Sequence, residues 1–119
     1  QLRAGAFLHA DDNYGMDKSF KREMKKVFPD KDWIELPLEH SIFNIHYKFP
    51  NGLPKIHEHS NQRPQALGLF HEETLMVLYT YESDLGDGWE DPKVHDDTEE
   101  LHEQALNMGT NIIIFALSR

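Results

Sequence analysis

The chain of 119 residues contains no cysteine. Disulfide bonds, thiolate metal sites and cysteine nucleophiles are therefore all excluded. Positive charge is scarce, because 12 Lys and Arg residues face 21 Asp and Glu residues and the net charge is −9. Nucleic acids and anionic membrane surfaces reward positive patches, so neither is expected as a partner. No apolar run approaches the roughly 20 residues that a membrane-spanning helix needs.

Three familiar catalytic signatures are also missing from the sequence. There is no glycine-rich phosphate loop, no serine in the setting of a nucleophile elbow, and no His-Glu-x-x-His pattern. The chain does contain hydrophobic residues, at 39% of the total, gathered into separate clusters. This length and this clustering suit the core of one domain.

A short apolar run that ends in acidic residues is the first candidate for a functional site. Residues Ala6 to Ala10 predict a buried strand, and Asp11, Asp12 and Asn13 follow it directly. Ligands of open α/β sheets bind beyond the carboxyl ends of the strands. We therefore expect a site at this turn.

The remaining pattern alternates between strands and helices. In the first half we expect a helix over Lys18–Phe28 capped by Asp17, a strand over Asp32–Leu36, and sparse regular structure over Glu39–Gln65. A hairpin of Ala66–Phe70 and Leu75–Tyr81 with a four-residue connection follows, and then an acidic loop over Glu82–Asp91. The last expected elements are a helix from an N-cap at Asp97 to Gly109 and a buried central strand over Ile112–Leu117. This order predicts a three-layer α/β sheet, mostly parallel, with an antiparallel hairpin.

The first five residues read like the last turn of a helix that Gly5 ends. We therefore expect further sequence to precede Gln1, so that the chain forms the C-terminal part of a longer domain. Such a sheet would lack strands along one edge, and either a preceding segment or a second copy of the chain would complete it.

Four segments resemble the family called domain of unknown function 4159. They are Leu2–Asp12, Leu38–Phe43, Leu75–Trp89 and Asn111–Leu117. The chain is also similar to the wider class I glutamine amidotransferase-like superfamily, which includes trehalose-utilisation-like proteins. The resemblance implies a flavodoxin-like doubly wound fold in a bacterial protein without an established activity. It also implies a periplasmic or exported location, with a cytoplasmic location as the alternative. Glutaminase chemistry needs a cysteine nucleophile and is excluded.

Two acidic groups at the expected strand ends are candidates for ligand binding. Asp11 and Asp12 are neighbours, so on an extended segment they point to opposite sides, and at most one faces a given pocket. Either one binds a cation or a sugar hydroxyl or acts as a base, or both have a structural role in the turn. The second group is formed by Asp84, Asp87, Glu90 and Asp91, in a loop that also contains Trp89. This loop fails the calcium-loop pattern because glycines occupy ligand positions. Both loops would converge if they leave the same sheet edge.

Histidines offer a further, weaker candidate. His57 and His59 lie on one side of an extended segment, a spacing compatible with a divalent transition metal. A third ligand would come from His40, His46 or His71, and the alternative is a set of exposed loop histidines.

These observations predict a binding domain for a small polar ligand or a carbohydrate, held by Asp11, Asp12, Asn13, His40, Asp84, Asp87 and Trp89. The alternative is a metal- or carboxylate-dependent hydrolase that acts on a carbohydrate-like substrate. In that case Asp12 would be the base, and His40 or the pair His57 and His59 would bind the metal.

Overall fold

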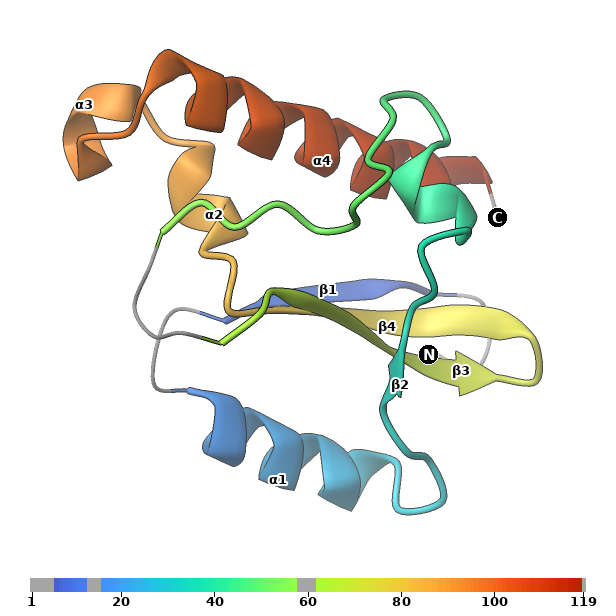
Figure 1. The fold of residues 1–119 in the computed structure, drawn as a ribbon. Helices are drawn as coiled ribbons and strands as arrows, with labels where there is room; N and C mark the ends of the chain where they lie inside the picture. The colour runs from blue at the N-terminus through green and yellow to red at the C-terminus, as the bar shows by residue number, and fades with distance from the viewer. Residues whose placement is uncertain (1–5, 13–15, 58–61, 119) are drawn as a thin grey trace.

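The computed structural model describes residues 6–12, 16–57 and 62–118. Figure 1 shows a four-stranded sheet between helices. In chain order the elements are β1 (Leu8–Asp11), α1 (Asp17–Val27), β2 (Ile34–Glu35), the 3-10 helix η2 (Ser41–Phe43), β3 (Gln65–His71), β4 (Thr74–Tyr81), α2 (Leu85–Gly88), α3 (Pro92–His95) and α4 (Glu99–Ser118).

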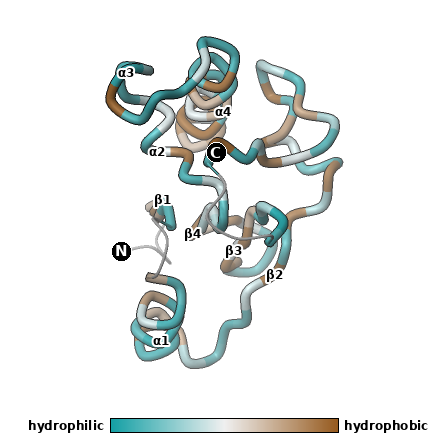
Figure 2. The backbone as a smooth tube through the Cα atoms, turned by 60° about the vertical axis from the view of Figure 1, so that its left-hand side comes forward, coloured by the Kyte–Doolittle hydropathy of each residue, from teal (hydrophilic) through white to brown (hydrophobic). Residues whose placement is uncertain are grey.

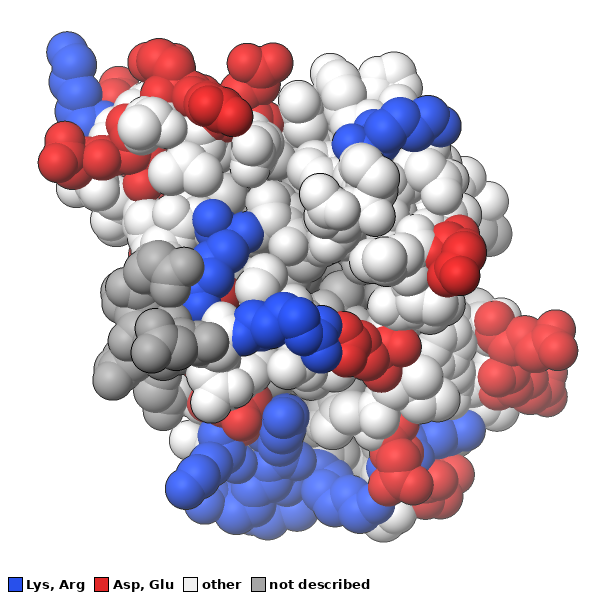
Figure 3. Space-filling model, viewed as in Figure 1, with Lys and Arg blue, Asp and Glu red and all other residues white. Residues whose placement is uncertain are grey.

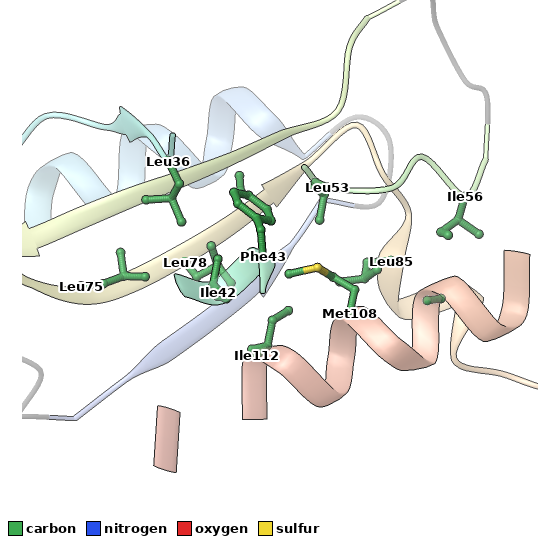
Figure 4. Packing of buried hydrophobic residues seen from close by; sticks show 12 residues of the cluster. Leu36, Ile42, Phe43, Leu53, Ile56, Leu75, Leu78, Leu85, Met108 and Ile112 are labelled. Atoms are coloured by element: carbon green, nitrogen blue, oxygen red, sulfur yellow. The ribbon is translucent and has the colours of Figure 1, made fainter. Parts of the chain in front are cut away.

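The molecule has three layers. Helix α1 covers one face of the sheet, and α4 with η2 covers the other, as Figures 1 and 2 show from two directions. Each face has its own apolar core. The core on the α4 side is the larger and includes Ile42, Phe43, Leu78, Leu85 and Met108 (Figure 4). The core on the α1 side is formed by Met24, Phe28, Leu69, Met76 and Val77. The expected three-layer α/β arrangement is therefore observed.

The sheet is mixed, with the strand order β1-β4-β3-β2. Strand β1 runs parallel to β4, whereas the β4–β3 and β3–β2 pairs are antiparallel. The expectation of a mostly parallel sheet is therefore wrong. The hairpin of β3 and β4 is confirmed, but His71 pairs with Thr74 and the turn has two residues instead of four. Glu72, with φ of 57°, supplies the left-handed backbone that such tight turns require.

The largest error of the sequence pattern concerns residues 112–117. They continue helix α4 instead of forming a central strand. Met108 and Ile112 face the core, while Ile113 is 61% exposed and Leu117 is 82% exposed. The apolar run is thus divided between a buried and an open face, which is a helical arrangement. The continuous hydrophobicity had indicated burial on both faces.

Gly109 does not end the helix, as the sequence had suggested. A Cβ atom at this position would lie 2.9 Å from Trp89 Nε1 and 3.0 Å from Trp89 Cε2. The glycine is needed because the indole packs directly against the helix backbone, and no left-handed turn is involved. Of the helices among the described residues, none combines the length and apolar character needed to cross a bilayer.

Helix α1 agrees with its prediction apart from its first turn and one apolar position. Asp17 is the first helical residue and accepts a hydrogen bond from the Tyr79 hydroxyl at 2.9 Å, so it does not cap the helix through its side chain. The spacing of Phe20, Met24 and Val27 at i, i+4 and i+7 predicts one buried stripe, and Met24 is buried accordingly. Val27 is 62% exposed, and Phe28 takes the inward position instead, because it lies four residues after Met24 on the same face.

The segment between β2 and β3 is sparse in regular structure within its described residues, as expected, and η2 is its one helical turn there. The buried Asn111 of α4 holds this segment in place. Its amide donates to the backbone oxygens of Ile42 and Tyr47, at 2.9 and 2.8 Å, and its oxygen accepts from the Tyr47 N–H at 2.9 Å. One side chain thus satisfies three backbone groups that have no sheet partner.

Candidate functional site

Strands β1 and β4 deliver two polar loops to one edge of the sheet. Because the strands are parallel, their carboxyl ends lie together, and the Asp12 N–H donates to the Thr80 oxygen at 2.9 Å. Beyond β4, Glu82 and Asp84 adopt left-handed φ values of 61° and 56°. Such backbone is uncommon for residues other than glycine and is frequent at functional sites. It turns the chain sharply into α2.

Asp11 connects the two loops. Its Oδ1 accepts from the Thr80 hydroxyl at 2.6 Å, and its Oδ2 accepts from the Gly86 N–H at 2.7 Å. His9 Nε2 lies 3.0 Å from the Thr80 hydroxyl oxygen. Burial raises the pKa of Asp11, opposed by these hydrogen bonds, and lowers the pKa of His9 to about 4. Asp11 therefore holds α2 against the end of β1, and both of its oxygens are occupied.

Asp12 points into a different environment. The residue is 2% exposed, and its Oδ1 has no hydrogen-bond partner among the described residues. Burial, followed by the charges of Asp17 and Glu82, raises the pKa of Asp12 to about 6, against a hydrogen bond from the Met16 N–H. Asp12 is thus associated with the start of α1, while Asp11 is bound to α2. Asn13 lies outside the described residues.

His57 lies between two buried carboxylates. Its Nδ1 is 3.1 Å from Asp84 Oδ2, and its Nε2 is 2.6 Å from Asp97 Oδ1. The Asp84 and Asp97 side chains are 3% and 2% exposed. Burial lowers the pKa of His57, but the hydrogen bonds to Asp97 and Asp84 outweigh it and the net shift is upward. Asp97 Oδ2 has no hydrogen-bond partner within the described part of the chain.

A second histidine lies beside this group. The rings of His57 and His95 are 5.4 Å apart, and His95 Nε2 is 3.0 Å from Glu90 Oε1 and 3.8 Å from Asp87 Oδ1. The hydrogen bond to Glu90, followed by the charge of Asp87, raises the pKa of His95. Acidic side chains gather over this end of the molecule, around α3 and the start of α4, while basic ones gather over α1 (Figure 3).

Two overlapping sets of side chains in this region could hold a metal ion. One set is His57, Asp84 and Asp87, and the other is Asp87, Glu90 and His95; within each set the ligand atoms lie within 4.8 Å of one another. We call the five residues of these sets together with Asp97 the His57 cluster.

Trp89, which directly precedes Glu90 of this cluster in the chain, lines a groove. Its Nε1 donates to the Ala105 oxygen at 2.7 Å, its ring is 6.0 Å from that of His9, and the residue is 39% exposed. The groove has a volume of about 450 Å³ and is mainly apolar. Its lining is formed by Phe7, His9, Trp89, Leu106, Gly109, Thr110, Ile112, Ile113 and Ala116. We call it the Trp89 groove; its size is typical of small-molecule sites.

His40 does not join the other candidates. Its Nδ1 accepts from the Ile42 N–H at 3.1 Å, which caps η2, and its ring packs on Phe115 at 5.3 Å. It shares a pocket with Thr74 at the start of β4, whereas the acidic loops follow the end of that strand. Eight strand residues span roughly 25 Å. His40 therefore lies at the other end of β4 from the acidic loops, which the sequence could not show.

The histidines expected beside His57 as metal ligands are not the side chains that contact it. The partners of His57 are Asp84 and Asp97, while His46 stacks against Tyr47. His71 ends β3 beside the hairpin turn. His59 lies outside the described residues.

Sequence reasoning missed Asp97 and His95. Asp97 was expected to cap α4, but the Thr98 hydroxyl oxygen does so by accepting from the Leu101 N–H at 3.1 Å. The Asp97 side chain therefore does not cap the helix and contacts His57 instead. The run from His95 to Thr98 contains a histidine and two acids beside a helix start, which was the available signal, although only the fold brings it to His57.

One protein family matches the chain in sequence. The family is described as a domain of unknown function (DUF4159), and the match covers residues 2–117. None of the curated proteins is detectably similar to the chain.

Proposed function

The chain belongs to the DUF4159 family, and we propose that it is a binding domain for a small polar ligand, with carbohydrates as the favoured class. The ligand would lie where the Trp89 groove meets the acidic edge formed by Asp84 and Asp87. This location follows the rule that ligands of α/β sheets bind beyond the carboxyl ends of strands.

The observation that carries the proposal is a partly exposed indole beside hydrogen-bonding side chains. Trp89 offers an apolar ring face along a groove of about 450 Å³, and His9 and Thr110 are polar groups in its lining. Sites for small molecules combine a mostly apolar wall with a few polar groups that fix orientation. Carboxylates accept hydrogen bonds from hydroxyl groups. The net charge of −9 disfavours an anionic ligand.

Hydrolysis with Asp12 as the base is the alternative. Asp12 interacts with Asp17 and Glu82 on the α1 side. His57 contacts Asp84 and Asp97 instead. A hydrolase of the expected kind needs its base and its metal at one substrate, while a binding domain needs no such contact. We therefore favour binding.

The finer fold assignment belongs to the same proposal. We propose a flavodoxin-like, amidotransferase-like domain of a bacterial, exported protein, in which the parallel pair β1–β4 is continued by further strands. Among the described residues β1 pairs with β4 alone, and Leu8 on this edge strand is 37% exposed. A preceding segment or a second copy would cover such an edge.

Saturation-transfer NMR with glucose, maltose and trehalose, in the presence of EDTA, tests the proposal. We expect transfer to at least one sugar, and a loss of most of the signal in Trp89→Ala. Val94→Ala is the matched control, because it removes a different exposed apolar side chain, on α3. This variant should retain the signal. Absence of transfer to all three sugars would contradict the proposed ligand class. Equal transfer in Trp89→Ala, with circular dichroism confirming the fold, would contradict the location.

A further inference from the structure

The imidazole of His57 is held in a defined orientation. Asp97 Oδ1 lies 2.6 Å from Nε2, the shorter of the two contacts of the ring, so we assign the proton of the neutral imidazole to this nitrogen, which then donates to the buried carboxylate. The other nitrogen, Nδ1, faces Asp84 Oδ2 at 3.1 Å. Metal-binding histidines typically donate one ring N–H to a carboxylate and use the other nitrogen as the ligand. His57 has this arrangement.

The side chains on the Nδ1 side are suitable ligands. The nearest available atoms of His57, Asp84 and Asp87 all lie within 4.8 Å of one another. Ligands that are each roughly 2.1 Å from a metal ion lie about 3–4 Å apart, so a small inward movement would complete the site. Asp84 is 3% exposed and therefore fixed by packing, while the more accessible Asp87 can adjust.

The charge of the region is unbalanced in favour of a cation. Asp84, Asp87, Glu90 and Asp97 surround two imidazoles, so carboxylates remain in excess even when both rings carry a proton. Asp97 adds a second, independent sign, because its side chain is 98% buried and its Oδ2 has no hydrogen-bond partner among the described residues. A buried carboxylate oxygen without a partner is costly unless a nearby positive charge compensates it.

We propose that His57, Asp84 and Asp87 bind a divalent transition-metal ion, zinc or manganese, and that Asp97 is the positioning residue for His57. One imidazole and two carboxylates suit these ions, whereas the absence of thiolates makes the site unsuitable for copper(I). Because His57 and Asp87 are only partly buried, the remaining coordination positions face solvent and are open to water or to an oxygen of a ligand.

The overlapping set of Asp87, Glu90 and His95 is the less suitable site. The Glu90 side chain is 52% exposed and the His95 side chain is 29% exposed. No buried carboxylate is hydrogen-bonded to the His95 ring among the described contacts, so neither ligand is pre-oriented as His57 is. Fixing two mobile side chains opposes binding by the conformational entropy that they lose.

Calorimetric titration of the EDTA-stripped, dialysed chain with zinc chloride and with manganese chloride tests the site. We expect saturable binding of one ion per chain. Asp87→Asn should weaken it by about 100-fold, because one of three ligands loses its charge, and Asp97→Asn by about 10- to 100-fold, because the histidine is no longer held by a carboxylate. Glu90→Gln is the matched control and should change the affinity less than about threefold.

Two results would overturn the proposal. The first is the absence of saturable binding of either ion to the folded chain. The second is a loss in Glu90→Gln and His95→Gln as large as the loss in Asp87→Asn, which would move the ion to the other set. If Asp87→Asn fails to fold, Asp84→Asn replaces it, since asparagine tolerates the left-handed backbone of position 84. The sugar measurement is made in EDTA, so the failure of either proposal is distinguishable from failure of the other.

Discussion

Two polar networks lie side by side at the carboxyl ends of β1 and β4, and they differ in how their hydrogen bonds are balanced. Asp11 is shared between the Thr80 hydroxyl and the Gly86 N–H, so each oxygen has a donor. The His57 cluster has more carboxylates than donors, and Asp97 retains an oxygen without a partner among the described residues. The Asp11 network has no acceptor oxygen left for another partner. The His57 cluster has acceptor oxygens left that a cation or a ligand could use.

The comparison explains why the sequence alone could not choose between the acidic residues. Asp11, Asp12, Asp84 and Asp97 are the same residue type, and all are largely buried at one end of the molecule. Their roles differ because different hydrogen-bond donors surround each carboxylate. Accounting for each buried polar atom separates the structural carboxylate from the candidate ligands.

The largest effect is expected at the satisfied network. Asp11→Ala removes the acceptor of Thr80 and of the Gly86 N–H and detaches α2 from β1. Each hydrogen bond to a charged group contributes about 1.5–3 kcal/mol, so we expect the free energy of unfolding to fall by about 3–4 kcal/mol. Urea denaturation followed by circular dichroism measures this.

Asp11→Asn is the control for that substitution. It retains one acceptor oxygen and should cost about half as much. A loss below about 1 kcal/mol in Asp11→Ala would contradict the structural role of Asp11 and return it to the candidate ligands.

Asn111 extends the comparison to a neutral side chain with a full set of partners. Asn111→Ala removes three hydrogen bonds that anchor the segment around Ile42 and Tyr47. We expect a loss of about 2–3 kcal/mol in the free energy of unfolding, again by urea denaturation. Glu103→Ala on the exposed face of α4 should stay within about 0.5 kcal/mol of the parent chain. Equal effects in the two variants would show that hydrogen-bond satisfaction does not identify the structural residues.

Local patterns predicted the elements whose environment is set by nearby residues. The apolar, β-rich runs of the β3–β4 hairpin and the apolar stripe of α1 are read from adjacent positions, and both elements form where expected. Residues 112–117 failed because a continuous apolar run suits either a covered strand or a helix with an exposed apolar face. Packing of Trp89 against Gly109 decides between these, and it joins residues 20 positions apart.

The candidate site was predictable in location and only partly in composition. Asp84 and Asp87 follow a recognisable strand, so their edge could be inferred. The contact of His57 with Asp97 spans 40 positions and depends on where α4 begins. His40 was expected at the site, but its capping of η2 is a local role that the sequence does not distinguish from ligand binding.

Asp12 shares features with both networks, and the pH dependence of the free energy of unfolding distinguishes its role. It is buried like Asp11, yet its Oδ1 lacks a partner among the described residues and its pKa is raised to about 6, from about 3.9 in an unfolded chain. The folded state therefore holds the proton more tightly. The stability that this proton confers is complete below a pH of about 4 and is lost as the pH rises through about 6.

Asp12→Asn imitates the protonated side chain and should remove this part of the pH dependence. We expect it to match the parent chain near pH 4 and to be more stable by about 1–2 kcal/mol at pH 7.5, because solvent near α1 screens part of the repulsion from Asp17 and Glu82. The difference between the two urea-denaturation profiles isolates Asp12, since the other titrating groups are common to both chains. A constant difference across this range would mean that Asp12 keeps its ordinary pKa. Its orphaned oxygen would then be matched by a donor, and Asp12 would belong with Asp11 among the satisfied carboxylates.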